Sequence, residues 1–191
     1  MIEYEELEIL GLKRQLPILP SPSGIKIAGF NPVGDMELLQ KSAKYLFNLL
    51  QNENIKYDII LTTELKGLPI AQEIASISQK NYVCLRKEAK CYMLNPIKTE
   101  SESITSGKST YYISQPELLT LKNKQVLFVD DVFSTGGTLI NMLKFAKEQD
   151  LEIIACATIL REVKKQDIMK NKNVLTFNGI NIYYCDYLPL P

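Results

Sequence analysis

The chain has 191 residues, of which 46% are hydrophobic and 23% charged, and its 22 lysines and arginines balance 22 aspartates and glutamates. This length is enough for one α/β domain with a full core and a small appendage. The balanced charge excludes a global basic field for nucleic acid or an anionic membrane, so any anion site must be local. The chain has no histidine, which excludes serine–histidine, cysteine–histidine and histidine–zinc chemistry.

The cysteines and the termini indicate where the protein resides. Four cysteines, at positions 84, 91, 156 and 185, form no CxxC pair, so we expect free thiols in a reducing compartment. The N-terminal sequence MIEYEELEIL is acidic and unlike a secretory signal. No apolar run is long enough to span a membrane. We therefore expect a cytoplasmic protein.

The first half of the chain alternates predicted strands and helices. Residues 1 to about 30 carry short apolar runs and prolines, which predicts an irregular, strand-rich segment. Asp35 is placed to cap a helix whose apolar stripe is Met36, Leu39, Ala43, Leu46, Phe47 and Leu50. YDIILTT predicts a strand buried on both faces. A helix follows in KGLPIAQEIASIS, with inward residues Ala71, Ile74 and Ala75, and then a strand in YVCLRK.

Residues 92 to 115 interrupt this alternation. They are rich in serine, threonine, glycine and lysine, and β-prone Tyr111 and Tyr112 stand near the end. The segment predicts a long mobile loop or a hairpin. Loops of this length in a compact domain are usually functional or disordered.

The second half resumes the alternation. QVLFVDD and EIIACATIL predict strands, and GGTLINMLKFAKEQ between them predicts a helix with Leu139, Met142, Leu143 and Ala146 inward. Asn178-Gly179 between two β-prone runs predicts a hairpin. The whole pattern predicts an α/β fold, a mostly parallel twisted sheet flanked by helices. The β-like N- and C-terminal segments would form a small cap.

The stretch VLFVDDVFSTGGTL, residues 126 to 139, carries polar residues that a packed core does not need. Asp130 and Asp131 would close a strand, and in open α/β sheets ligands lie beyond the carboxyl ends of strands. The glycine- and hydroxyl-rich turn that follows opens a helix, so its backbone N–H groups would hold a phosphate. The carboxylates suit sugar hydroxyls or a metal ion. A phosphorylated sugar satisfies both halves of the motif.

VDDVFSTGGT resembles the phosphoribosyl-pyrophosphate (PRPP) signature of type I phosphoribosyltransferases. LTTELKGLPIAQEIA stands where that family has its pyrophosphate loop, and LRKEAK resembles the RKxxK segment of adenine-type members. TSGKSTYY falls where the family has a flexible loop that closes over the reacting centre. The resemblance covers about residues 31 to 160. It implies one domain, with a core of about 31–171, a hood from about 1–30 and 172–191, and a flexible loop of about 95–113.

The resemblance also implies a role for each matching residue. Asp130 and Asp131 would bind the ribose hydroxyls and, with Lys108 of the closing loop, would be catalytic. The 5-phosphate would lie on Ser134, Thr135, Gly136, Gly137 and Thr138. The pyrophosphate, carrying Mg²⁺ with no direct protein ligand, would lie on Glu64, Lys66, Gly67, Arg86, Lys87 and Lys90. The base would contact Val132, Phe30 and Tyr184.

The resemblance favours adenine as the base. Members that use 6-oxopurines often place an aspartate at the first position of the phosphate turn, where this chain has Ser134. The alternatives are a hypoxanthine, guanine or xanthine phosphoribosyltransferase, or a non-catalytic regulator of the same fold that senses PRPP or purines. The expected partners are PRPP, a purine base and a second copy in a homodimer, with no nucleic acid and no membrane.

Overall fold

The computed structural model describes residues 2–20, 24, 26–103, 107–168 and 173–190, and the side chains of 101–109 lie outside this set. Its main element is a six-stranded sheet with the order β10-β11-β9-β8-β4-β5. Every neighbouring pair is parallel except β10–β11. The strands are β4 (Ile59–Thr63), β5 (Asn81–Leu85), β8 (Gln125–Phe133), β9 (Glu152–Lys164), β10 (Val174–Phe177) and β11 (Ile180–Leu190). This confirms the predicted fold class.

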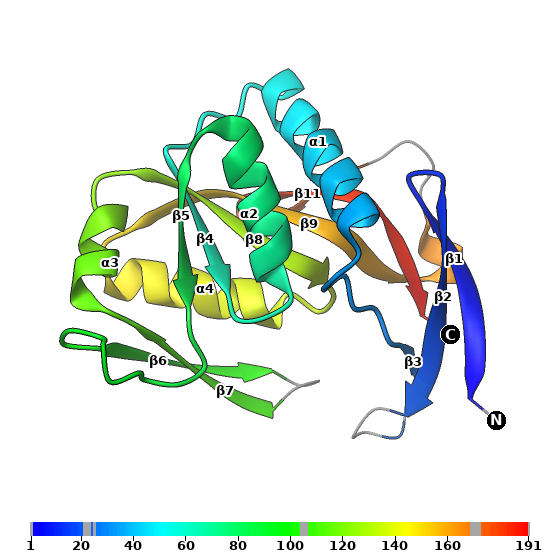
Figure 1. Ribbon diagram of the computed structural model, residues 1–191, viewed down its shortest axis with the longest axis horizontal. Coiled ribbons are helices and arrows are strands. Elements are labelled where there is room, and N and C mark those ends of the chain that lie inside the picture. The colour runs from blue at the N-terminus through cyan, green and yellow to red at the C-terminus, as the bar shows by residue number, and fades with distance from the viewer. Residues whose placement is uncertain (1, 21–23, 25, 104–106, 169–172, 191) are drawn as a thin grey trace.

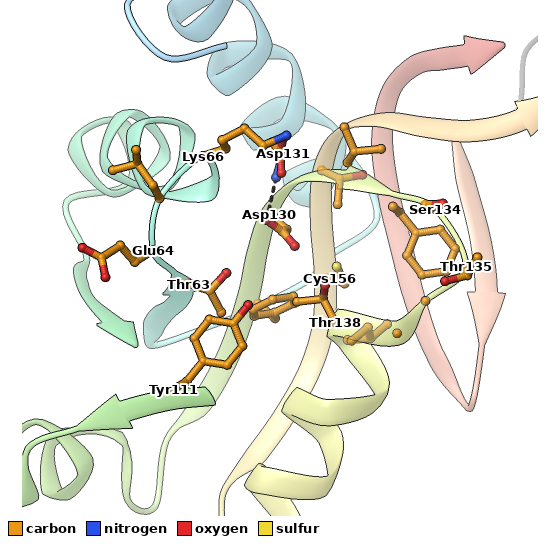
Figure 2. A pocket seen from close by; sticks show the side chains of 18 of the residues that line it. Thr63, Glu64, Lys66, Tyr111, Asp130, Asp131, Ser134, Thr135, Thr138 and Cys156 are labelled. Atoms are coloured by element: carbon orange, nitrogen blue, oxygen red, sulfur yellow. Dashed lines mark hydrogen bonds and ion pairs between the residues drawn. The ribbon is translucent and has the colours of Figure 1, made fainter. Parts of the chain in front are cut away.

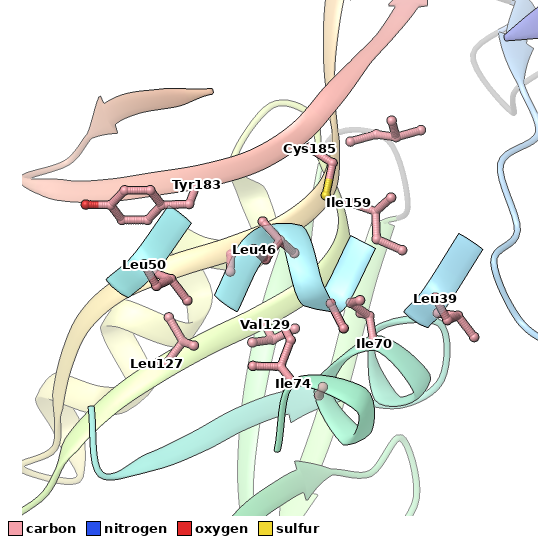
Figure 3. Packing of buried hydrophobic residues seen from close by; sticks show 14 of the residues in the cluster. Leu39, Leu46, Leu50, Ile70, Ile74, Leu127, Val129, Ile159, Tyr183 and Cys185 are labelled. Carbon is pink, nitrogen blue, oxygen red and sulfur yellow. The ribbon is translucent and has the colours of Figure 1, made fainter. Parts of the chain in front are cut away.

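Helices cover both faces of the main sheet (Figure 1). One face is covered by α1 (Met36–Asn52) and α2 (Gly67–Ser78), and the other by α3 (Gln115–Leu121) and α4 (Gly137–Glu148). A short 3-10 helix, Lys165–Asp167, follows β9. In Figure 3, leucines of α1 and isoleucines of α2 pack against Leu127 and Val129 of β8. Among the described residues, we find no helix with the length and apolar character needed to span a bilayer.

The start of α1 matches its prediction. The Asp35 side chain accepts a hydrogen bond from the backbone N–H of Leu38 and forms an ion pair with Arg14 at 2.6 Å. The predicted apolar stripe was wrong at its first residue. Met36 is half exposed, and Leu38 is fully buried instead. The cap and the ion pair fasten the N-terminal sheet to the first helix.

The N-terminal segment forms a separate antiparallel sheet of β1 (Glu3–Ile9), β2 (Leu12–Pro20) and β3 (Lys26–Ala28). The C-terminal hairpin has the predicted turn at Asn178-Gly179, both with positive φ. We expected this hairpin in the cap, but β11 extends the main sheet beside β9. Its contacts with β1 and β3 bring the two termini of the chain to the same side of the molecule (Figure 1).

The segment that interrupts the alternation is a hairpin. Strands β6 (Ile97–Ser103) and β7 (Gly107–Ile113) pair antiparallel, and its tip, 104–106, lies outside the described residues. Arg86 and Tyr112 exchange backbone hydrogen bonds of 2.9 and 2.7 Å. These bonds attach the hairpin to the end of β5.

Candidate active site

A pocket of about 470 Å³ opens at the carboxyl ends of β4 and β8. Figure 2 shows that its walls come from the segment after β4, the end of β8, the start of α4, and Tyr111 of the hairpin. Its lining residues are Thr63, Glu64, Leu65, Lys66, Lys87, Tyr111, Phe128, Asp130, Asp131, Val132, Phe133, Ser134, Thr135, Gly136, Gly137, Thr138, Leu139, Cys156 and Thr158. The structure therefore brings together the aspartates, the glycine turn and two of the predicted cations.

Asp130 and Asp131 lie within β8, which continues to Phe133 rather than ending at the aspartates as we expected. The carboxylate of Asp131 is buried and forms an ion pair with Lys66 Nζ at 2.6 Å. Lys66 Nζ also donates to the carbonyl of Phe30 at 3.2 Å. Lys66 therefore connects the aspartates with the chain that enters α1.

The two aspartates have different surroundings. Burial, and then the charge of Asp131, raise the pKa of Asp130 well above its ordinary value of 3.8. A Cβ atom added to Gly67 would lie 2.8 Å from Thr62 Oγ1 and 3.0 Å from Asp130 Oδ1. The start of α2 can therefore approach Asp130 this closely only because residue 67 is glycine. The pair offers adjacent oxygen acceptors, which suits two neighbouring hydroxyls of a sugar.

The turn after β8 is held in place by aromatic packing. Gly136 has a φ of +83°, and a Cβ atom there would lie 2.5 Å from the Phe177 ring. Phe177 packs edge-to-face on Phe133, with ring centroids 5.3 Å apart. Gly136 precedes α4, whose first N–H groups have no acceptor within the helix and carry partial positive charge. The turn can accept a phosphate.

The structure brings only some of the predicted pyrophosphate-binding residues to the pocket. The backbone N–H of Lys87 donates to the Glu64 carboxylate at 2.9 Å, which joins the segment after β4 to the end of β5. The side chains of Glu64, Lys66 and Lys87 line the pocket. Arg86 and Lys90 do not line it. Arg86 lies 5.6 Å from the Tyr92 ring centre, and Lys90 forms an ion pair with Glu88 at 2.9 Å.

The remaining predicted residues divide into three groups. Val132 lines the pocket, as the expected contact with the base requires. Phe30 packs in the core, and Tyr184 is fully buried with its hydroxyl 3.0 Å from that of Tyr187, so neither lines the pocket. Lys108 stands in β7, but its side chain lies outside the described residues.

Strand β9 also contributes to the site, which the sequence pattern did not predict. Cys156 and Thr158 line the pocket, and Glu162 accepts a hydrogen bond from the Ser134 hydroxyl. Glu162 lies in the part of β9 that runs beyond the predicted strand end at Leu160. The sequence did contain a pattern that could have predicted this contribution. Thr158, Leu160 and Glu162 are every second residue of β9, so they share one face of a strand that pairs with β8, which carries the two aspartates.

The donor atoms at the pocket show which kind of metal ion the site could accommodate. Among the described residues, no cluster of three or more histidines, cysteines, aspartates or glutamates is arranged to hold a metal ion. The adjacent Asp130 and Asp131 supply hard oxygen atoms. This donor set fits Mg²⁺ that takes most of its ligands from substrate phosphates and water.

Comparisons with known proteins agree with this geometry. The family described as "Phosphoribosyl transferase domain" matches residues 33–187. A hypoxanthine/guanine phosphoribosyltransferase of Methanotorris igneus is 28% identical over 141 residues, which cover 74% of this chain and 73% of that protein. One of Methanococcus voltae is 32% identical over 111 residues, covering 58% of this chain and 56% of that protein.

Solved structures give the same fold. The adenine phosphoribosyltransferase of Thermoanaerobacter pseudethanolicus superposes with a TM-score of 0.64 at 20% identity, covering 96% of this chain and 95% of that one. Identity this low supports the fold alone. The family match covers most of the chain and includes the whole pocket, so the chain belongs to the type I phosphoribosyltransferase family.

Proposed function

We propose that the protein is a purine phosphoribosyltransferase, which transfers the phosphoribosyl group of PRPP to a purine base and releases pyrophosphate. One observation carries the proposal. A single pocket of about 470 Å³ joins a pair of carboxylates, a phosphate-binding turn and two lysines. PRPP has vicinal ribose hydroxyls, a 5-phosphate and a pyrophosphate, and each matches one of these groups.

The charges of the pocket suit the chemistry. Breaking the bond between C1 of the ribose and pyrophosphate builds positive charge on the sugar, as in glycoside cleavage. Asp130 and Asp131 line the pocket, where they would stabilise that charge. Lys66 and Lys87 also line the pocket, and they would meet the negative charge growing on the leaving group. No covalent intermediate on the protein is required.

The turn supplies binding energy away from the reacting carbon. A 5-phosphate on Thr135, Gly136, Gly137 and Thr138 would orient the sugar between the aspartates and the lysines. Mg²⁺ bound to the pyrophosphate would supply further charge neutralisation of the leaving group. The hairpin wall at Tyr111 would help to exclude water, which otherwise competes with the base.

For the base, we place 6-oxopurines first and adenine second, which reverses the order that the sequence favoured. The relatives named hypoxanthine/guanine phosphoribosyltransferases are 28% and 32% identical to this chain. The adenine enzyme of similar structure is only 20% identical. Similarity in sequence therefore favours hypoxanthine or guanine, while the structural likeness is common to the fold.

The test is a PRPP-dependent assay with adenine, hypoxanthine, guanine, xanthine, orotate and uracil, with and without Mg²⁺. We expect a nucleoside monophosphate from hypoxanthine or guanine, in a Mg²⁺-dependent reaction. Asp131→Asn should fold normally and lose turnover strongly, because the ribose loses a charged acceptor and Lys66 loses its partner. Asp150→Asn, in the exposed turn after α4, is the control and should match the wild type. PRPP binding without turnover of any base would instead indicate a regulator.

A further inference from the structure

Lys66 makes one contact that the function proposed above does not use. Its Nζ atom donates a hydrogen bond of 3.2 Å to the backbone carbonyl of Phe30, in addition to its ion pair of 2.6 Å with Asp131. Phe30 follows β3, and the segment 29–35 connects that strand with the start of α1. Figure 2 shows Lys66 reaching from the start of α2 toward Asp131. The lysine thus fastens the segment 29–35 to the wall of the pocket.

The backbone of the segment 29–35 is shaped by local hydrogen bonds. The N–H groups of Phe30 and Asp35 donate to the carbonyls of Ala28 and Pro32 at 2.9 and 3.0 Å. These bonds fold the segment on itself and do not tie it to α2. The contact from Lys66 does join its backbone to the start of α2, so losing that contact should ease local opening of the segment.

The geometry allows Lys66 to change partners easily. Its side chain is 47% exposed, whereas that of Asp131 is 9% exposed. The bond to the Phe30 carbonyl is already at the long end of the range for N–H···O bonds, so a shift of Nζ by roughly 0.4 Å away from Phe30 ends it. Lys66 lines the pocket, and a pyrophosphate group there would attract it strongly because that group carries several negative charges.

We propose that Lys66 is a latch that pyrophosphate opens, an inference that rests on the proposed function. In the free protein the latch holds the segment 29–35 against the start of α2. A pyrophosphate group, free or as part of PRPP, draws Lys66 into the pocket and releases the Phe30 carbonyl. Phe30 and Val132 belong to one hydrophobic cluster, and Val132 lines the pocket where we expect the base. Filling the leaving-group site therefore loosens the chain beside the base.

Hydrogen–deuterium exchange tests the latch, with magnesium pyrophosphate as the probe. Ligands usually slow exchange in the parts of a protein that they contact, so faster exchange on binding is a distinctive result. We expect pyrophosphate to speed exchange in a peptide covering 29–35 by about 5–30-fold, because a hydrogen bond from a half-exposed charged group contributes modestly to the local opening equilibrium. Ribose 5-phosphate, which would lie on the turn before α4, should leave this peptide unchanged.

The two lysines of the pocket provide a matched pair of variants. In Lys66→Met the side chain has no donor, so the segment 29–35 should exchange fast without a ligand and should not respond to pyrophosphate. Adding Asp131→Asn removes the carboxylate left without its partner and should give the same result, which excludes misfolding as the cause. Lys87 lines the same pocket, but its backbone N–H bonds to Glu64. Lys87→Met should bind pyrophosphate more weakly and still show the wild-type acceleration at saturation.

The outcomes separate the latch from the proposed function. If pyrophosphate binds and exchange in 29–35 slows or stays unchanged, the latch is wrong and the proposed function stands. If the variant lacking both Lys66 and Asp131 exchanges as slowly as the free wild type, Lys66 does not hold the segment and the latch is again wrong. If pyrophosphate speeds exchange but no purine is turned over, the latch stands and the proposed function fails. If the wild type binds no pyrophosphate, both fail.

Discussion

The glycine at the end of the phosphate turn allows the sharpest test of the site's architecture. In Gly136→Ala, two independent costs arise. The residue has a φ of +83°, where an L side chain is strained by roughly 1–2 kcal/mol. Its new Cβ atom would also lie 2.5 Å from Cζ and 2.7 Å from Cε1 of Phe177. Carbon atoms rest about 3.5–4 Å apart, so the ring or the turn must move by about 1 Å.

This movement gives the magnitude of the effect. Moving the Phe177 ring disturbs its edge-to-face contact with Phe133, whose ring centroid is 5.3 Å away. Such aromatic pairs contribute roughly 0.5–1.5 kcal/mol, and overpacking costs roughly 1–3 kcal/mol. When the backbone strain is added to the overpacking, of which the disturbed ring contact is a part, we expect Gly136→Ala to lower the free energy of unfolding by about 2–5 kcal/mol. KM for PRPP should rise, because the turn that would hold the 5-phosphate is displaced.

Urea unfolding and initial-rate kinetics measure these effects, and the chain offers a matched control. Gly179 has a φ of +78° with no other heavy atom within 4 Å of an added Cβ. Gly179→Ala therefore carries the backbone strain alone, roughly 1–2 kcal/mol, and should leave KM for PRPP unchanged. Adding Phe177→Leu to Gly136→Ala should recover part of the lost stability, because it removes the ring that the new methyl group meets. Equal losses in Gly136→Ala and Gly179→Ala would refute the proposed role of Phe177 in shaping the turn.

Three other predictions concern charges and thiols. Asp130→Asn should be more stable than the wild type at neutral pH, because the raised pKa of Asp130 means that its ionised carboxylate opposes folding. The urea unfolding midpoints of the variant and the wild type should therefore be similar below pH 3.8 and should diverge as pH rises through the folded pKa. Asp35→Ala should lose about 1–2 kcal/mol at neutral pH. The hydrogen bond from Arg14 holds the pKa of Asp35 below 3.8, so the same unfolding series should show that loss shrinking as pH falls through the folded pKa. A thiol reagent at neutral pH should modify Cys91 rapidly and leave the other cysteines unmodified, because burial raises the pKa of each: Cys84, Cys156 and Cys185.

The sequence predicted the elements of the core because their apolar periods are strong. The caps and turns also followed from local chemistry, as Asp35 and Asn178-Gly179 show. The motif after residue 126 was sufficient to locate the pocket, because in a parallel sheet the carboxyl ends of the strands share one edge. Family membership was likewise evident from the motif and its flanking segments.

Other features depend on pairing across the sheet, which a local pattern does not specify. β8 continues past Asp131 because Val132 and Phe133 pair with Leu160 and Arg161 of β9. The C-terminal hairpin joins the main sheet because β11 pairs with β9 over most of its length. Glu162 enters the site for the same reason, since the extended β9 places it beside Ser134. Aromatic character alone was a poor guide to the base, as the buried positions of Phe30 and Tyr184 show.

The electrostatics of the pocket explain how two adjacent carboxylates are tolerated before substrate binds. Lys66 offsets the charge of Asp131, and its charge also lowers the pKa of Asp130, although burial and Asp131 outweigh it. A pyrophosphate group in the pocket would compete with Asp131 for Lys66, because it is an anion of higher charge. Lys66 would then neutralise the leaving group, and the charge of Asp131 would be free to stabilise the cationic ribose. The same lysine would thus connect the binding of the leaving group with the charge available at the reacting sugar.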